Sequence, residues 1–305
     1  MSSVTDASVI RQKQIAPGYY RLSLAAPEVA GAARPGQFLH VRCGNTLDPL
    51  LRRPISIHAV DREKGEVTLL YRVAGRGTAL LSETKRGGVI SLLGPLGTGF
   101  TLPENHERVS IVAGGIGIAP LYFLLQELSV RDFCATVFLG AVTRKQFVAI
   151  RKIKKHANKA TKLSIVDEIK EMGHKVVLAT DDGTVGFRAT ITDLFDCCTQ
   201  NRSSEKALLY CDGDLGEALE KVKLECVFLT DRVYGCGPSG MLKGLCEILK
   251  RQHIPGEVSL EERMGCGVGA CLSCACKTRD GEDGFRYRRA CVEGPVFPVG
   301  EVVWE

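Results

Sequence analysis

The first third of the chain alternates short apolar runs with turn-forming residues. Pro-Gly at 35–36, Lys-Gly at 64–65 and Gly-Gly at 87–88 separate these runs. Many short strands with regular turn signals are typical of an antiparallel barrel or sandwich. One short helix is expected at 78–84, after a glycine turn. The predicted strands are residues 19–25, 37–42, 54–60, 66–73 and 89–93.

From about residue 103 the pattern changes to strands that alternate with helices. Such alternation predicts a mostly parallel sheet with helices on its faces. From about 255 the chain is rich in Gly and Cys, with little room for regular structure. The fold class is therefore α+β multidomain: an antiparallel β-barrel at 1–102, an α/β parallel-sheet domain at 103–254 and a small C-terminal domain at 255–305. The expected middle strands are 109–113, 135–140, 175–180 and 227–234, with helices at 120–128 and 239–250.

Composition places the chain among ordinary globular proteins, with 45% hydrophobic and 25% charged residues. The net charge of +5 is too small to indicate a nucleic-acid-binding protein. The surplus is concentrated in the basic run 144–162, which contains no acidic residue. We interpret this run as a solvated, inserted helix, with docking to an acidic partner as the alternative. Nucleic acid is not expected, because Phe147 is the sole aromatic residue there.

The N-terminal residues show no apolar core of a secretory signal. An uncharged stretch at 109–126 is long enough to raise the question of a membrane span. It contains several glycines and Pro120, which favour strand, tight turn and helix start instead. We therefore expect a soluble, cytoplasmic protein without a membrane partner.

The strongest chemical signal is a cysteine loop near the C-terminus. Cys266-x4-Cys271-x2-Cys274 is followed, after 16 residues, by Cys291. This is the plant-type spacing for a [2Fe–2S] cluster, in which four thiolates hold two irons. We prefer the distant Cys291 to Cys276 as the fourth ligand, because that ligand must come from the other side of the cluster.

Glycines and the remaining cysteines support this interpretation. Gly265, Gly267 and Gly269 let the loop backbone wrap closely, with amide N–H groups directed at anionic sulfurs. A disulfide framework is not expected from the 13 cysteines, because the chain is long and lacks an export signal. The alternative is a structural zinc site, but zinc sites usually pair two CxxC knuckles, and Cys271/Cys274 form one.

Two glycine turns follow predicted strands of the middle domain. A strand that runs into glycines and opens a helix can direct backbone N–H groups at a phosphate. Carboxyl ends of parallel strands share the sheet edge where open α/β sheets bind ligands. Two such turns at one edge favour a dinucleotide over a turn without ligand. The first turn holds Gly114, Gly115, Gly117 and Pro120; the second holds Cys236, Gly237 and Pro238.

A third set of residues lies in the predicted barrel. Taken alone, Arg52 and Arg53 fit an ordinary strand with solvated arginines. Downstream, however, a glycine turn opens a short helix, and arginine, backbone turn and hydroxyl are the parts needed to hold a diphosphate. The residues of this set are Arg53, Pro54, Ile55 and Ser56, then Leu70, Tyr71 and Arg72, then Gly77 and Thr78.

The segment from Arg53 to Ser56, the two glycine turns and the cysteine loop follow one another along the chain. These segments, in this order, resemble those of the ferredoxin reductase superfamily. Within it the chain is similar to the electron-transfer subunits of heteromeric, NAD-linked dihydroorotate dehydrogenases of pyrimidine biosynthesis. The most specific parts are residues 259–274 and 291–297. The middle domain is longer than this resemblance predicts, at 144–162 and around 199–216.

The resemblance implies FAD in the barrel, NAD(H) on the middle domain and a [2Fe–2S] cluster in the C-terminal loop. FAD would contact the barrel set that begins at Arg53, and the cluster would bind Cys266, Cys271, Cys274 and Cys291. NAD would contact Gly114, Gly115 and Gly117, with Cys236, Gly237 and Pro238 near the nicotinamide. Arg144 and Lys145 follow the second strand, where an acidic residue often holds the ribose of NAD. These basic residues could instead accept a 2′-phosphate, so NADP remains an alternative to NAD.

The implied function is electron transfer, and no residue of this chain is assigned an acid–base role. The implied partner is an FMN-containing dihydroorotate dehydrogenase catalytic subunit, in a heterotetramer with two copies of each. We find no dihydroorotate site, so activity on dihydroorotate is expected only with that partner. The alternatives are the small subunit of an NADH-dependent ferredoxin:NADP oxidoreductase, or of a related sulfide dehydrogenase, and a zinc-stabilised nucleic-acid-binding protein. Cys266 argues against the first, whose family is expected to carry a carboxylate at that position.

Overall fold

The computed structural model describes residues 3–44, 47–144, 164–199, 229–281 and 284–304. These residues form two compact units. The first contains the described residues of 1–101, 119–127 and 257–305, and the second contains those of 102–118 and 128–256. Apart from Arg144, the basic run lies outside the described residues, as do Lys145 and most of 199–216. The three-domain division stays a prediction.

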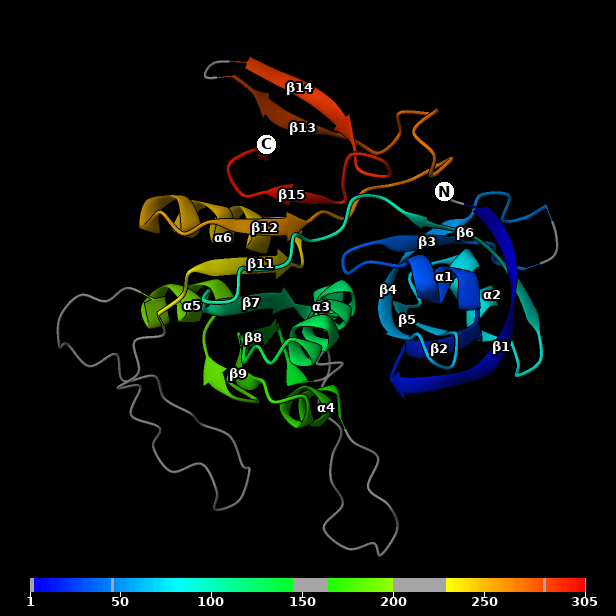
Figure 1. Ribbon diagram of the computed structural model, residues 1–305, viewed down its shortest axis with the longest axis horizontal. Helices are drawn as coiled ribbons and strands as arrows, with labels where there is room; N and C mark the ends of the chain where they lie inside the picture. Colours follow the sequence, from blue (N-terminus) through cyan, green and yellow to red (C-terminus); the bar gives the residue numbers. More distant parts are fainter. Residues whose placement is uncertain (1–2, 45–46, 145–163, 200–228, 282–283, 305) are drawn as a thin grey trace, which may run out of the picture. The chain divides into compact units, whose positions relative to one another are not determined.

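The N-terminal part of the first unit is a closed antiparallel barrel with the strand order β1-β2-β5-β4-β3-β6 (Figure 1). Side chains such as Leu22, Leu39 and Leu69 fill its interior and are fully buried. Two short helices, α1 (Pro27–Ala32) and α2 (Arg76–Ser82), accompany the strands. The strands are β1 (Ser3–Ala16), β2 (Tyr19–Ala25), β3 (Phe38–Val41), β4 (Arg53–Asp61), β5 (Glu66–Arg72) and β6 (Val89–Leu96).

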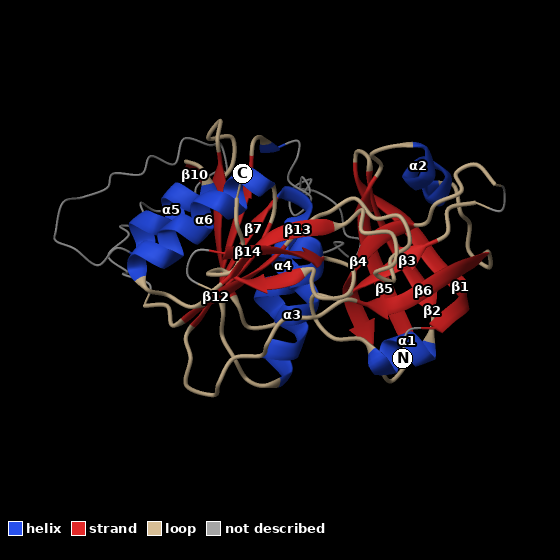
Figure 2. Cartoon of the chain, turned by 90° about the horizontal axis from the view of Figure 1, so that it is seen from above, coloured by secondary structure: helices blue, strands red, loops and turns tan. Residues whose placement is uncertain are grey.

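The second unit contains a parallel sheet in the order β10-β9-β8-β7-β11, of which β9, β8, β7 and β11 are labelled in Figure 1. Helix α5 (Ile191–Thr199) packs against three strands of this sheet and against α6 (Ser239–Gln252) (Figure 2). Helix α4 (Ile165–Glu171) packs on β9, and α3 spans Ile118–Val130. The strands are β7 (Val109–Gly114), β8 (Thr136–Ala141), β9 (Lys175–Thr180), β10 (Phe187–Arg188) and β11 (Arg232–Cys236).

The C-terminal residues of the first unit contain regular structure that the sequence analysis did not predict. β12 (Gly256–Ser259) pairs antiparallel with β15 (Val296–Pro298). β13 (Ala275–Asp280) and β14 (Gly284–Arg289) form an antiparallel pair. The expectation of little regular structure after 255 was therefore wrong. The backbone groups of this segment pair with one another even though it contains no long apolar run.

The predicted fold class is confirmed, with a closed antiparallel barrel, a parallel sheet with helices and a small C-terminal part. Helix α3 begins at Ile118, two residues before the expected start, so Pro120 is in its first turn. Proline is tolerated there because the N–H groups of the first turn have no partner within the helix. No helix within the described ranges is long and apolar enough to cross a bilayer.

A buried histidine connects strand β4 to helix α3 within the first unit. His58 lies 3.1 Å, through Nδ1, from the carbonyl oxygen of Ala119 and 3.4 Å, through Nε2, from Arg21 Nη2. Since a carbonyl can only accept, Nδ1 carries the proton and Nε2 accepts from the guanidinium. The ring also lies 4.3 Å from that of Tyr122. Burial, reinforced by Arg21, lowers the pKa of His58 to about 3.

This environment predicts a pH-dependent loss of stability. Below pH 6.5 the unfolded chain protonates this histidine, whereas the folded chain does not until about pH 3. The free energy of unfolding should therefore fall with decreasing pH, by up to about 1.4 kcal/mol per unit from this group. His58→Gln should reduce the slope between pH 6.5 and 5. Urea unfolding followed by the fluorescence of Trp304, the single tryptophan, measures it; equal slopes would contradict the assignment.

Candidate functional site

The cysteine loop closes around the sulfur of its first cysteine. Cys266 Sγ accepts hydrogen bonds from the backbone N–H groups of Val268, Ala270 and Cys271, at 3.4, 3.3 and 3.4 Å. Gly267 and Gly269 have φ angles of +74° and +82°, which side-chain-bearing residues rarely adopt. The glycines thus permit the tight wrap that directs several amides at one sulfur.

The other predicted cysteines lie in two different environments. Cys271 is exposed, and its thiol lies 3.1 Å from Ser273 Oγ. This serine and the Cys266 backbone lower the pKa of Cys271 to about 6. Cys274 and Cys291 are buried beneath the loop with exposures of 2% and 1%. Burial, followed by the neighbouring Cys274 thiol, raises the pKa of Cys291 to about 12.

The sulfurs therefore form two pairs. Cys266 and Cys271 exchange backbone N–H···Sγ contacts of 3.4 Å, while the thiols of Cys274 and Cys291 interact with each other. In the described part of the chain, no three His, Cys, Asp or Glu side chains converge as ligands of a single metal ion. One zinc ion needs such convergence. Two pairs instead fit a group with two irons, because each iron takes two thiolates.

Cys276 lies outside this arrangement. It is on β13 and pairs with Arg288 of β14. Its thiol donates to the carbonyl oxygen of Arg288 at 3.3 Å, and burial raises its pKa to about 11. The thiol is thus already hydrogen-bonded to the neighbouring strand, which supports the prediction that Cys276 is a bystander and not a cluster ligand.

The cysteine loop packs on the outer face of barrel strand β3. Phe38 belongs to a buried cluster with Leu96, Cys274 and Cys291. His40, two residues along the same strand, is 1% exposed and lies against Gly267. A Cβ at Gly267 would be 2.6 Å from His40 Nδ1, so this glycine is required by close approach of the ring. Burial, with Arg52 nearby, lowers the pKa of His40.

The structure brings Arg53 and Gly77 of the predicted barrel set together. A Cβ at Gly77 would lie 2.8 Å from Arg53 Nε, so the guanidinium covers the start of α2. Arg53 Nη1 donates to the carbonyl oxygen of Leu51 at 2.6 Å. Thr78 Oγ1 accepts from the N–H groups of Ala74 and Gly75 at 2.9 and 3.2 Å. The hydroxyl therefore stabilises the turn that precedes the helix.

Strand alternation divides the rest of the barrel set between two faces. The side chains of Ile55 and Tyr71 belong to the barrel core. A cofactor on the outer face would therefore meet the main chain of these two residues. Pro54 and Ser56 are half-buried on the other face of β4, where they pair with His40 and Phe38 of β3. Leu70 is buried outside that core cluster, and Arg72 is exposed.

The two glycine turns of the second unit touch each other. They end adjacent parallel strands, with Ala113 of β7 opposite Cys236 of β11. A Cβ at Gly117 would lie 2.1 Å from the carbonyl oxygen of Cys236. A Cβ at Gly114 would lie 2.9 Å from Pro238 Cδ. Gly115 has a φ of +55° and borders open space. The predicted nucleotide residues thus form one compact edge of small residues.

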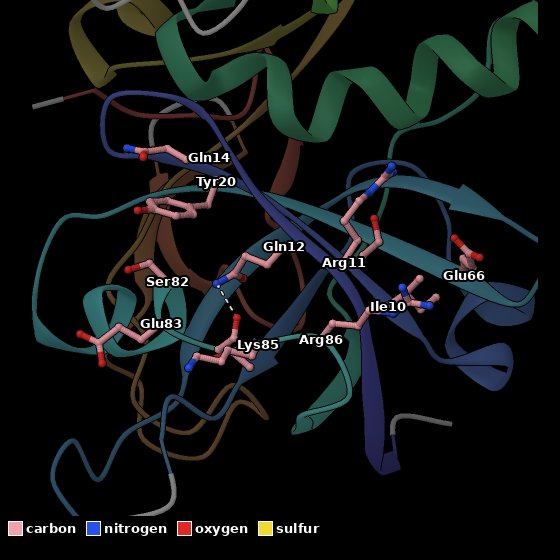
Figure 3. Close-up of a pocket in the computed structure, with 12 residues that line it drawn as sticks. Ile10, Arg11, Gln12, Gln14, Tyr20, Glu66, Ser82, Glu83, Lys85 and Arg86 are labelled. Atoms are coloured by element: carbon pink, nitrogen blue, oxygen red, sulfur yellow. Dashed lines mark hydrogen bonds between the residues drawn. The ribbon is translucent and has the colours of Figure 1, made fainter. Parts of the chain in front are cut away.

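A pocket of about 710 Å³ lies elsewhere on the barrel, between β1 and the end of α2 (Figure 3). Its lining contains none of the predicted site residues. Gln12 crosses it and donates to the carbonyl oxygens of Leu81 and Thr84 at 2.8 and 3.2 Å, so its amide completes the helix end.

Two features of these sites were not predicted from the sequence. His40 gave no sequence signal, because its position depends on a loop more than 220 residues away. Asp181 and Asp182 follow β9, and their N–H groups bond to the carbonyls of Ala141 and Val142 at the end of β8. Carboxylates therefore lie at the edge of the sheet where the nucleotide is expected, one strand beyond the strand that Arg144 follows. The Asp-Asp-Gly turn after a strand could have indicated them.

Known proteins resemble the chain along its whole length. Residues 261–303 match the family described as the iron-sulfur cluster binding domain of dihydroorotate dehydrogenase B. The dihydroorotate dehydrogenase B (NAD(+)) electron transfer subunit of Desulforamulus reducens is 44% identical over 306 residues, which cover 100% of both chains. That of Bacillus cereus (strain B4264) is 37% identical over 97% of this chain and 96% of its own. The predicted extra length of the middle domain stays a prediction.

A solved structure is similar as well. A chain of an NADH-dependent reduced ferredoxin-NADP oxidoreductase, studied for flavin-based electron bifurcation, superimposes with a TM-score of 0.73 at 26% identity. The match covers 100% of this chain and 92% of that chain. The similarity in fold therefore extends over the full length of this chain.

The contact between the glycine turns generates a prediction. Gly117→Ala places a methyl group against the Cys236 carbonyl, so we expect a loss of about 1–3 kcal/mol or more in the free energy of unfolding. Gly240→Ala is the matched control, because nothing lies within 4 Å of its Cβ and α6 is helical there. It should change stability by no more than about 1 kcal/mol. Urea unfolding of both variants tests this, and equal stabilities would contradict the close contact.

Proposed function

The chain belongs to the family of electron transfer subunits of NAD-dependent dihydroorotate dehydrogenase B, and we propose that it transfers electrons from an FMN-containing catalytic subunit to NAD+. The observation that carries this proposal is the 44% identity to such a subunit over the full length of both chains. Under this proposal the chain is half of an oxidoreductase in pyrimidine biosynthesis. It acts on dihydroorotate when its partner is bound.

We assign FAD to the outer face of the barrel. Arg53 would contribute positive charge to the diphosphate, and Ser56 a hydroxyl beside it. Gly77 leaves the space that the guanidinium of Arg53 fills, so the charge stays at the start of α2. Thr78 stabilises the turn that precedes this helix, because its hydroxyl accepts from the N–H groups of Ala74 and Gly75. Leu70, Tyr71 and Arg72 end the neighbouring strand β5 and would contact FAD from there.

We assign the [2Fe–2S] cluster to Cys266, Cys271, Cys274 and Cys291. The paired sulfurs fit two irons, and the amides directed at Cys266 Sγ suit an anionic group. Burial of Cys274 and Cys291 keeps water from one side, while Cys271 is exposed on the other. The low pKa of Cys271 favours the thiolate that a metal requires.

We assign NAD(H) to the edge formed by Gly114, Gly115 and Gly117. The small residues leave backbone N–H groups accessible to a diphosphate. Cys236, Gly237 and Pro238 form the adjoining turn, near which the nicotinamide would lie. When bound, these groups would supply hydride exchange between nicotinamide and flavin and one-electron relay by the cluster. The protein's part is to bind each group and to orient it.

A second candidate is the small subunit of an NADH-dependent ferredoxin:NADP oxidoreductase, which the TM-score of 0.73 favours. The lower identity of 26% and the presence of Cys266 make it the weaker proposal. The two candidates differ in the partner and not in the layout, so the partner must be tested directly.

The cluster assignment predicts opposite results for two serine variants. Cys291→Ser should lose or destabilise the cluster while FAD stays bound, because a buried thiolate ligand is removed. Cys276→Ser should keep the visible absorbance and iron content, because Cys276 bonds to its neighbouring strand. Iron analysis and visible spectra of the purified chains measure both. Bleaching by Cys276→Ser but not by Cys291→Ser would show that the fourth ligand is wrongly chosen.

The functional proposal predicts partner-dependent activity. The purified chain should reduce artificial dyes with NADH but should not oxidise dihydroorotate. Addition of an FMN-containing catalytic subunit from the same organism should give dihydroorotate-dependent reduction of NAD+ in a stable complex. Absorbance at the NADH band and size-exclusion chromatography measure these outcomes. Dihydroorotate oxidation by this chain alone would overturn the proposal, as would coupling to a ferredoxin:NADP partner in its place.

A further inference from the structure

His40 is a buried polar side chain whose hydrogen bonding is incomplete. It is 1% exposed, and within the described residues neither ring nitrogen has a partner in hydrogen-bonding geometry. An unpaired buried donor costs about 1–3 kcal/mol. An apolar residue at position 40 would fill the same space without this cost. Phe38, two positions away on the same face of β3, is such an apolar residue. The ring therefore indicates a partner outside the protein atoms.

Two neighbours limit where that partner can be. Nδ1 faces the cysteine loop, since a Cβ at Gly267 would come within 2.6 Å of it. The backbone carbonyls of Cys266 and Arg52 lie beside the ring. On the strand side, His40 is directly opposite Pro54 of β4, in the set assigned to FAD. The imidazole thus lies between β4, to which we assign FAD, and the loop to which we assign the cluster.

We propose that His40 is a positioning residue for the cluster: its ring N–H donates a hydrogen bond toward the group that the loop at Cys266–Gly267 would hold, and it raises the reduction potential of that group. The inference rests on the proposed function, because it requires a [2Fe–2S] cluster in this loop. An N–H dipole aimed at an anionic group stabilises the additional electron, and hydrogen bonds around the sulfurs are one determinant of cluster potentials. Every protonation state of imidazole retains at least one N–H donor.

The position of Gly267 supports this role over packing alone. With a φ of +74° and the ring against its Cα, this glycine brings the loop closer to β3 than any side chain would allow. Arg289 holds the other side of the loop, through a 3.3 Å hydrogen bond from Nη1 to the carbonyl oxygen of Gly269. The loop is therefore fixed by Arg289 on one side and by the imidazole of His40, next to β4, on the other.

Two substitutions separate the hydrogen bond from packing. His40→Leu removes the donor and keeps much of the volume, and His40→Gln retains an N–H donor. In the full chain purified without oxygen, we expect His40→Leu to make cluster reduction about tenfold less favourable, a fall of about 59 mV for one electron. The potential of His40→Gln should stay much closer to that of the wild-type chain, because glutamine retains an N–H donor. Cys276→Ser, in the same segment, is the control and should leave the potential unchanged.

The measurement is a redox titration followed by electron paramagnetic resonance, with iron and FAD analysis of each variant. An unchanged potential in His40→Leu with full iron and FAD would overturn the proposal. So would a shift confined to the flavin potential, which would assign the ring to FAD. A wild-type chain that lacks iron would instead contradict the proposed function, so the two failures are distinguishable.

If His40→Leu does not fold or does not take up iron, the wild-type chain decides the question. Electron–nuclear double resonance of the reduced protein labelled with 15N-histidine should show coupling between the cluster spin and a histidine nitrogen. His40→Gln should abolish this coupling while the cluster remains. Absence of the coupling in the wild-type chain would overturn the proposal.

Discussion

Strand β3 has no solvent-facing side, and the arrangement of the first unit depends on this constraint. Leu39 and Val41 belong to the barrel core, whereas Phe38 and His40 are buried against the C-terminal segment. A slip of one residue would exchange the two faces, so the register is strongly specified. Because β4 pairs with β3, the residues from Arg53 to Ser56 are fixed relative to the cysteine loop as well.

Elements with a strong hydrophobic pattern could be predicted from the sequence, and elements defined by distant pairing could not. The bounds of β2 and β9 were predicted correctly, because apolar runs bounded by turns identify them. β1 was missed since few of its 14 residues are buried and many are polar. It is ordered by pairing with β2 and β6. β14 was missed for the same reason, because most of its side chains are exposed.

The candidate site divides in the same way. The cysteine loop could be identified because its ligand spacing is local, and so could the glycine turns that follow strands. That Gly117 touches Cys236, and that Arg53 covers Gly77, could not be deduced, since each contact joins segments distant in sequence. His40 is the extreme case. Nothing around it in the sequence distinguishes it from a satisfied core histidine, and its incomplete hydrogen bonding is visible only once the loop packs on β3.

Strand β4, to which we assign FAD, and the cysteine loop belong to one compact unit, which matters for electron transfer. One-electron exchange is sensitive to distance, so a protein that relays electrons must keep its donor and acceptor sites at a constant separation. Here that separation is set by a strand buried on both faces and by close backbone contact, as where Thr98 donates to the carbonyl oxygen of Gly294 at 2.5 Å. A Cβ at Gly97 would also lie 2.6 Å from that oxygen, so the contact leaves no room for a side chain. Gly97 and Gly267 therefore serve the same purpose as the hydrophobic core of the first unit: they hold the C-terminal segment close to the barrel.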